Sequence, residues 1–135
     1  MTRDTKIQVA ALPLRKRKGK TQVLLITSRE TKRWVIPKGW PMDGVTDYQA
    51  AKIEAFEEAG VDGRISKVPL GHFDYEKRLK SGGVKHVRVM IYALKVSTLK
   101  RNWPEKDQRE RKWFSPEAAA ERVLEDALKA IIAAV

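Results

Sequence analysis

The order of apolar and polar positions along the chain predicts a sheet whose strands are interleaved with few helices. Runs rich in β-branched residues either alternate with polar residues or continue as short buried stretches, which is typical of strands. Glycine and proline residues separate these runs. The predicted strands are residues 7–14, 23–27, 34–36, 64–68, 70–75, 84–96 and 113–114.

The first predicted helix occupies residues 48–59. Thr46 or Asp47 provides the N-cap, because a short polar side chain there can accept a hydrogen bond from a free backbone N–H group. Gly60 follows the helix and suits the left-handed conformation with which many helices end.

A second helix is expected over residues 116–134, starting from the segment Ser115-Pro116-Glu117. Apolar residues recur along it at near-helical spacing and predict a face that packs on the core. These residues are Ala119, Val123, Ala127 and Ile131. Two helices are too few for a doubly wound parallel sheet, so the pattern predicts an α/β sandwich with a mixed sheet.

Length and composition predict one domain over residues 1–135, since a chain of 135 residues with 42% hydrophobic content can form a single core. The chain has no cysteine, which excludes a disulfide scaffold, a thiolate zinc site and a cysteine nucleophile. The N-terminal residues lack the apolar core of a signal peptide, and no apolar stretch is long enough to span a membrane. We therefore expect a cytoplasmic protein without membrane contact.

The formal net charge is +11, from 28 basic and 17 acidic residues. This excess favours polyanionic partners, such as nucleic acid, phosphorylated nucleotides or inositols, or an acidic surface. The basic run RKRKGK at residues 15–20 has two interpretations, the solvated tip of a hairpin or a rim that contacts phosphate.

Three glutamates in the first predicted helix are the candidate chemistry. Glu54, Glu57 and Glu58 are spaced i, i+3 and i+4, so they share one helix face. Alanines flank them, which indicates a partly covered side where like charges repel and resist desolvation. A hard divalent cation, Mg²⁺ or Mn²⁺, relieves that repulsion. The alternative is an ordinary solvated acidic face.

Residues 37–61 resemble the Nudix box, whose pattern is G-x5-E-x7-R-E-U-x-E-E-x-G-U with U apolar. The residues in register are Gly39, Glu54, Ala55, Glu57, Glu58, Gly60 and Val61. Two positions depart, Val45 at the first glutamate and Ile53 at the arginine. The segments RWVIPKGW at 33–40 and RERKWFSPEAA at 109–119 look like the diphosphoinositol-polyphosphate and diadenosine-polyphosphate phosphohydrolase branch of this family.

The resemblance implies a Nudix-type α/β/α sandwich that hydrolyses a phosphoanhydride bond by metal-assisted attack of water on phosphorus. Carried over by position, Glu54 and Glu58 would ligate Mg²⁺, with Mn²⁺ as the alternative, together with the backbone carbonyl of Lys38. Glu57 would be a metal ligand or the general base. We take it as the base, with Glu54 as the second choice.

The two departures remove groups that the family uses to support the box. In the family the arginine pairs with a box glutamate and orients it, which Ile53 cannot do, so an unpaired glutamate with a raised pKa is expected. Val45 removes an auxiliary carboxylate. The candidates to replace that carboxylate are Asp43, Asp47, Asp74 and Glu76.

Basic and aromatic side chains provide the candidate substrate site, because Arg and Lys recognise phosphate and a loop tryptophan can stack on a base such as adenine. The candidates are Arg15, Arg17, Lys18, Arg33, Lys38, Trp40, Arg88 and Arg111. Further candidates of the same kinds are Lys16, Lys20, Lys85, Arg109, Lys112 and Trp103.

The predicted substrate is a highly phosphorylated small molecule, such as a dinucleoside polyphosphate or a diphosphoinositol polyphosphate. Two alternatives stay open. One is removal of pyrophosphate from RNA 5′ ends, which would use the same box and a longer basic track. The other is a degenerate Nudix fold that binds nucleotide or nucleic acid without catalysis. The three retained glutamates argue against the second alternative, because clustered negative charge does not help to bind a polyanion.

Overall fold

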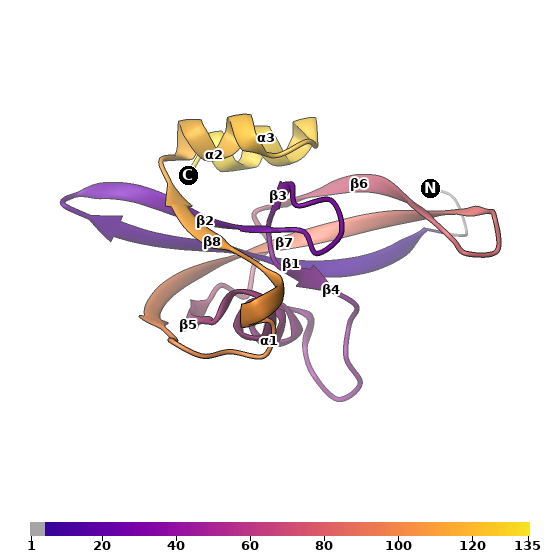
Figure 1. Cartoon of the computed structure of the whole chain (residues 1–135), viewed down its shortest axis with the longest axis horizontal. Coiled ribbons are helices and arrows are strands. Elements are labelled where there is room, and N and C mark those ends of the chain that lie inside the picture. The colour runs from indigo at the N-terminus through magenta and orange to yellow at the C-terminus, as the bar shows by residue number, and fades with distance from the viewer. Residues whose placement is uncertain (1–4) are drawn as a thin grey trace.

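The apolar runs form one mixed sheet in the computed structural model, which describes residues 5–135 (Figure 1). The strands are β1 (Lys6–Arg17), β2 (Lys20–Thr27), β3 (Trp34–Val35), β4 (Lys38–Gly39), β5 (Val61–Ile65), β6 (Gly71–Arg78), β7 (Val84–Leu99) and β8 (Arg111–Phe114). The main strand order is β3-β2-β1-β7-β5, with β4 added to β1, β6 to β7 and β8 to β2. Only the β1–β7 pair is parallel among the described strands, so the predicted mixed sheet is confirmed.

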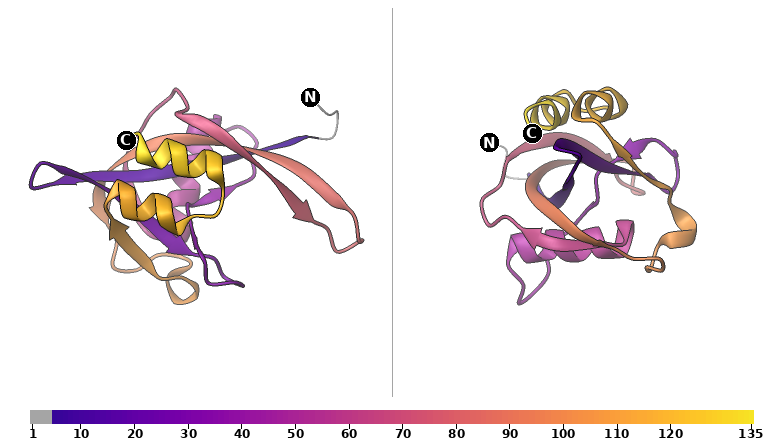
Figure 2. Two further views of the ribbon diagram at one scale, coloured as in Figure 1. Left: turned by 90° about the horizontal axis from the view of Figure 1, so that it is seen from above. Right: turned by 90° about the vertical axis from the view of Figure 1, so that its left-hand side faces the viewer.

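Helices cover both faces of this sheet (Figures 1 and 2). The helix α1 (Asp47–Ala59) lies on one face, and α2 (Pro116–Arg122) and α3 (Asp126–Ala133) lie together on the other. A 3-10 turn, η1 (Lys106–Gln108), precedes β8. The expected α/β/α sandwich is confirmed. No helix of residues 5–135 is long and apolar enough to cross a membrane.

Strand β1 runs through the middle of the sheet, which explains the apolar run from Val9 to Leu14. Residues 8–13 are all buried, and their side chains alternate between the two faces. Val9 and Ala11 pack with the alanine face of α1, whereas Ala10 and Leu12 belong to the core beneath α2 and α3. The alternation therefore divides the interior into two cores, and α1 is the only helix over its own core among the described residues.

Several strand boundaries differ from the sequence-based prediction. The two-residue strand β4 was not predicted, and β6 continues three residues further than expected, to Arg78. The strand predicted at 64–68 lies instead at β5, where Val61 pairs with Leu99 and a bulge follows Asp62. It ends at Ile65 because the Ser66 hydroxyl bonds to both backbone groups of Val68 and closes a local turn.

The single helix predicted over residues 116–134 was wrong, because the chain is extended at Val123 (φ −85°, ψ 159°). The buried residues of this region are Ala119, Val123, Leu128 and Ile132, and Ala127 is exposed. On one straight helix the last two would lie roughly 180° around the axis from the first two, at 100° per residue. Breaking the helix allows both halves to bury their apolar residues on the same sheet.

We expect Gly60→Ala to destabilise the fold more than Gly44→Ala. Both glycines are left-handed, with φ of 66° and 73°, so each alanine costs about 1 kcal/mol in backbone strain. A Cβ atom at Gly60 would also lie 2.5 Å from the ring of Trp103, whereas Gly44 has open space. Displacing that ring adds about 1 kcal/mol or more. Urea unfolding of both variants measures the difference, and equal losses would contradict this packing role.

Candidate active site

The C-terminal end of α1 is anchored by side chains from the segment that leads into β8. Trp103 donates from Nε1 to the carbonyl of Glu58 at 3.2 Å. Arg111 donates from Nη1 to the carbonyls of Ala59 (2.9 Å) and Gly60 (3.2 Å), and its guanidinium lies 3.9 Å from the centre of the Trp103 ring. These contacts satisfy the free carbonyls at the helix end, and they fix the last turn, which carries Glu58.

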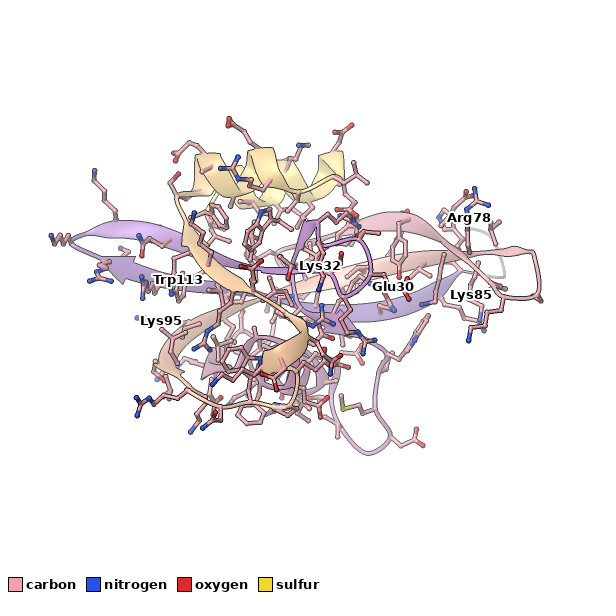
Figure 3. The ribbon with its side chains drawn as sticks, in the orientation of Figure 1. Glu30, Lys32, Arg78, Lys85, Lys95 and Trp113 are labelled. Atoms are coloured by element: carbon pink, nitrogen blue, oxygen red, sulfur yellow. The ribbon has the colours of Figure 1, made fainter. Side chains whose placement is uncertain are left out.

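Glu54 and Glu58 of α1 face a cavity of about 870 Å³, which we call the glutamate pocket. It opens between α1, β4, β6 and the loop that follows β2. Glu30 and Arg78, both labelled in Figure 3, are among its lining residues. Its acidic lining residues are Glu30, Glu54, Glu58, Glu76 and Glu105, and its basic ones are Arg29, Arg33, Lys38, Lys77, Arg78 and Arg109. The cavity therefore combines carboxylates and cations in nearly equal number.

Glu54 lies directly against the backbone of β4. A Cβ atom at Gly39 would overlap the Glu54 carboxylate, so only glycine permits this approach. Burial raises the pKa of Glu54, and the neighbouring charge of Glu57 raises it further. The glycine at the start of the box thus has a steric task, to admit a carboxylate beside a backbone strand.

Glu58 is the buried carboxylate of the site, with 9% of its surface exposed. Its Oε1 accepts a hydrogen bond from the backbone N–H of Lys38 at 3.3 Å. Burial raises the pKa of Glu58 to about 8, despite the opposing charge of Arg109. The carboxylate is thus held in an environment that disfavours its charged form unless a further cation joins it.

Arg109 is an ion-pair partner of Glu58 that lies outside the box. Its side chain is nearly buried, and Nη2 lies 3.7 Å from Glu58 Oε1. Its Nε donates to Glu105 at 2.7 Å, and its Nη1 donates to the carbonyl of Thr27 at 3.1 Å. The expectation of a glutamate with a raised pKa is confirmed at Glu58, but the expectation that it is unpaired was wrong, because a guanidinium arrives from the segment before β8.

A second chain of polar contacts crosses the pocket. Lys38 donates from Nζ to the hydroxyl of Tyr75 at 3.2 Å, and that hydroxyl donates to Gln8 Oε1 at 2.8 Å. Burial lowers the pKa of Lys38, although the charge of Glu58 opposes this. On the opposite wall Arg33 donates from Nη2 to Glu125 at 3.2 Å, while its buried Nη1 has no hydrogen-bond partner within residues 5–135. Both cations line the cavity, and Arg33 keeps one N–H donor group without an acceptor in residues 5–135.

The donor groups of the pocket fit a hard divalent cation. The protein supplies only part of the coordination shell of such a cation. Glu54 and Glu58 lie within reach of one another, and the backbone of β4 passes beside both. Residues 5–135 contain no group of three or more His, Cys, Asp or Glu side chains that could hold a metal ion alone. Mg²⁺ is commonly bound by one or two carboxylates, with water and substrate phosphate completing its shell, so two glutamates suffice for that mode.

The structure brings some of the predicted site residues together. Glu54, Glu58, Lys38, Arg33 and Trp40 all line the glutamate pocket. Glu57 is exposed on α1 beside them and is not part of the lining. Of the candidates to replace the auxiliary carboxylate missing at Val45, only Glu76 is among the lining residues.

The other predicted substrate residues lie elsewhere. Arg15 stacks over Trp113, 4.1 Å from the ring centre, and Arg17 and Lys18 continue into the turn between β1 and β2. Arg88 makes a two-pronged contact with Asp74, at 2.9 and 3.1 Å. Arg111 caps α1, as described above.

Glu105, Tyr75, Lys77 and Arg78 are lining residues that the sequence did not single out. Tyr75 and Lys77 are two residues apart on β6. A prediction that extended this strand to Arg78 would therefore have placed both side chains on one face of the sheet. Arg109, a further candidate to meet phosphate, lines the pocket and pairs there with Glu58.

The comparisons with known proteins support the resemblance to the Nudix box. The family model for the NUDIX domain matches residues 4–135. Nudix hydrolase 12, mitochondrial, of Arabidopsis thaliana is 36% identical over 109 residues, which cover 76% of this chain and 52% of that protein. Human diphosphoinositol polyphosphate phosphohydrolase 3-beta is 31% identical over 116 residues, which cover 84% and 66%. The chain spans about half the length of the first curated relatives it matches.

Solved structures share the fold. The Ap4A hydrolase of C. elegans superposes with a TM-score of 0.65 at 22% identity, over 96% of this chain and 94% of that one. The NUDIX domain of Shewanella oneidensis NrtR, solved with ADP ribose, superposes with a TM-score of 0.71 at 17% identity, over 98% and 88%. At these identities the likeness establishes the fold alone.

In metal-free buffer we expect the stability of the protein to fall between about pH 5 and 8, and we expect Glu58→Gln to remove most of that fall, because Glu58 has the larger pKa shift of the two glutamates of the pocket. The folded pKa of Glu58, about 8, lies above its ordinary value of 4.5. Between these values the folded protein keeps a proton that the unfolded chain releases, so folding becomes less favourable as pH rises. Glutamine mimics the protonated acid and has no such penalty.

Thermal unfolding in EDTA across this pH range measures the effect. The melting temperatures of wild type and Glu58→Gln should agree near the acid end and diverge above neutrality, with the variant more stable. Glu57→Gln removes the same charge from an exposed position of the same helix and serves as the control. Parallel curves for wild type and Glu58→Gln would contradict the burial of a charged carboxylate.

Proposed function

This chain belongs to the Nudix family, and we propose that it is a metal-dependent hydrolase that cleaves a phosphoanhydride bond in a highly phosphorylated small molecule. The observation that carries the proposal is that two glutamates and a rim of cations line one cavity. Dinucleoside polyphosphates and diphosphoinositol polyphosphates are the proposed substrates. The names of two similar proteins, an Ap4A hydrolase and a diphosphoinositol polyphosphate phosphohydrolase, support this choice.

Glu54, Glu58 and the backbone carbonyl of Lys38 are the proposed ligands of Mg²⁺, with Mn²⁺ as the alternative. When bound, such a cation neutralises phosphate charge and lowers the pKa of bound water. The raised pKa of both carboxylates supports this assignment, because a nearby positive charge would offset the cost of their burial.

The cations of the pocket are proposed to bind the phosphate groups. Arg33 has a buried Nη1 that lacks a partner within the described residues, and Lys77 and Arg78 extend from the end of β6. Trp40 is 41% exposed at the rim, with Lys77 Nζ 6.0 Å from the centre of its ring, and is proposed to stack on a base. Charged and aromatic groups on one rim suit a ligand that carries several phosphates and a flat group.

Glu57 is the proposed general base, with Glu54 as the alternative. The charge of Glu57 contributes to the raised pKa of Glu54, so the two carboxylates lie within electrostatic reach. Glu57 is solvent-exposed, so it can pass a proton to bulk water once it has taken one from the attacking water. Glu105 is a third carboxylate at this end of the pocket, but Arg109 already holds it at 2.7 Å.

A small molecule is preferred over an RNA 5′ end because the cavity is bounded. Its volume of about 870 Å³ falls in the range of small-ligand sites, roughly 300–1,000 Å³. The basic run at residues 15–20 contributes nothing to its lining, so no basic track leads from the pocket along that hairpin. The non-catalytic alternative is opposed by Glu54 and Glu58, because clustered carboxylates do not help to bind a polyanion.

A substrate panel tests the proposed function. The purified protein is incubated with Mg²⁺ and diadenosine polyphosphates, inositol pyrophosphates, ADP-ribose or triphosphorylated RNA, and products are identified by mass spectrometry. We expect turnover of a dinucleoside polyphosphate or an inositol pyrophosphate that stops in EDTA.

Glu57→Gln should lower kcat by about 100-fold at little change in KM, the size expected for loss of a general base. Absence of metal-dependent turnover on every substrate, together with tight nucleic-acid binding, would contradict the hydrolase proposal. An unchanged rate in Glu57→Gln would move the base to Glu54.

We expect Arg109→Gln to lower kcat/KM by roughly 10- to 100-fold, the usual effect of losing a group that orients a metal ligand. The apparent Mn²⁺ affinity, measured by calorimetry without substrate, should fall with it, because Glu58 and Glu105 lose their shared partner. Arg109→Lys keeps the charge and should recover part of both. Arg101→Gln, which removes an exposed arginine, is the control. If Mn²⁺ affinity is unchanged while melting temperature falls, Arg109 is only a stabilising residue.

A further inference from the structure

A second cavity lies at the end of the sheet near the β1–β2 turn, and we call it the basic pocket. It has a volume of about 590 Å³ and is lined by residues of β1, β2, β5 and β7 and by Ser66. It shares no lining residue with the glutamate pocket. On β1, Gln8 lines one cavity and Leu14 the other, about 20 Å apart at 3.3 Å per residue. Figure 3 labels Lys95 at this end of the molecule, far from Arg78.

The charged residues of the basic pocket are all cations. Arg15, Lys16, Arg64 and Lys95 belong to its lining, and no carboxylate does. Arg15 is held by Gln22 and Trp113, but the side chains of the other three have no ion pair or hydrogen bond within residues 5–135. By contrast, Arg33, Arg88 and Arg109 all have carboxylate partners. Part of the positive excess of the chain is thus concentrated, without counter-charge, around one cavity.

Strand register forces two of these cations together. Arg64 of β5 and Lys95 of β7 are directly opposite each other, and Lys95 is also the neighbour of Leu14 on β1. Lys16 follows Leu14 by two residues and therefore projects from the same face. Like charges opposite one another across strands are destabilising, so a bound anion between them would convert a repulsion into two attractions. The same arrangement, Lys77 opposite Lys85, occurs beside the pocket proposed to bind phosphate.

The rest of the basic pocket suits the organic part of such an anion. Leu14 and Ala93 are half-buried and give it an apolar floor, and the hydroxyls of Thr21 and Ser66 lie at its edge. Its volume is that of a small-ligand site. We propose that the basic pocket is a second, non-catalytic binding site for an organic phosphate of nucleotide size, with phosphate between Arg64 and Lys95 and the organic group over the apolar floor.

Residue-resolved NMR titration of the full chain with ATP in EDTA tests this site, since the omission of divalent metal suppresses the proposed turnover. We expect saturable shifts of the backbone amides of Arg64, Ser66, Ala93 and Lys95. Lys95→Glu should weaken the affinity read at these amides by about tenfold or more, the loss of one charged contact to phosphate. Lys80→Glu makes the same charge change at the tip of the β6–β7 hairpin and should alter that affinity by less than about twofold.

Three outcomes would overturn the proposal. The first is the absence of saturable shifts at these amides, and the second is an equal loss in Lys95→Glu and Lys80→Glu, which would reveal a general charge effect. The third is tighter, Lys95-dependent binding of a single-stranded oligonucleotide than of ATP, which would assign the surface to nucleic acid. Tripolyphosphate, which lacks an organic group, should bind about fivefold more weakly than ATP if the apolar floor contributes. Substrate turnover by Lys95→Glu should stay within twofold of wild type, so this test is independent of the proposed catalysis.

Discussion

The burial of the Glu58 carboxylate, with half-buried Glu54 beside it, is the constraint on which the site depends. Desolvation opposes their charged form, and the structure answers with a backbone N–H group from Lys38 and a guanidinium from Arg109. Even together, the N–H group and the guanidinium do not bring the pKa of Glu58 back to its ordinary value. Residues with no part in the chemistry sustain this arrangement. Alanines let α1 approach the sheet, Gly39 makes room for Glu54, and Arg111 fixes the helix end.

Arg109 illustrates how a motif position can be vacated without losing the interaction it provides. Ile53 is 36% exposed and cannot pair with a glutamate, yet Glu58 has an arginine partner that comes from a segment 51 residues further along the chain. The position of this guanidinium is fixed by the carbonyl of Thr27 and by Glu105. The site requires a guanidinium beside the carboxylate, and any element of the fold that passes close to the carboxylate can supply it.

Features set by neighbours in sequence could be predicted, whereas those set by distant contacts could not. The caps of α1 at Thr46 and Gly60 follow from local hydrogen bonding, and periodicity placed Glu54 and Glu58 on one face. Periodicity also grouped Glu57 with them, but it does not show which side chains on that helix face other elements bury. The edge of the pocket falls between Glu54 and Glu57. Long basic side chains were least predictable. Arg88 and Arg111 have partners on other elements, so their tasks depend on the tertiary fold.

The division of charge between the two cavities changes the meaning of the net charge of +11. That excess favoured a polyanionic partner, but the glutamate pocket has five acidic and six basic lining residues and is nearly balanced. A balanced pocket suits a cation and a polyphosphate together, because the carboxylates need one and the basic side chains the other. Part of the surplus lies around Arg64 and Lys95, in a cavity whose lining contains no carboxylate. A cavity of that kind attracts an anion directly and needs no metal to do so.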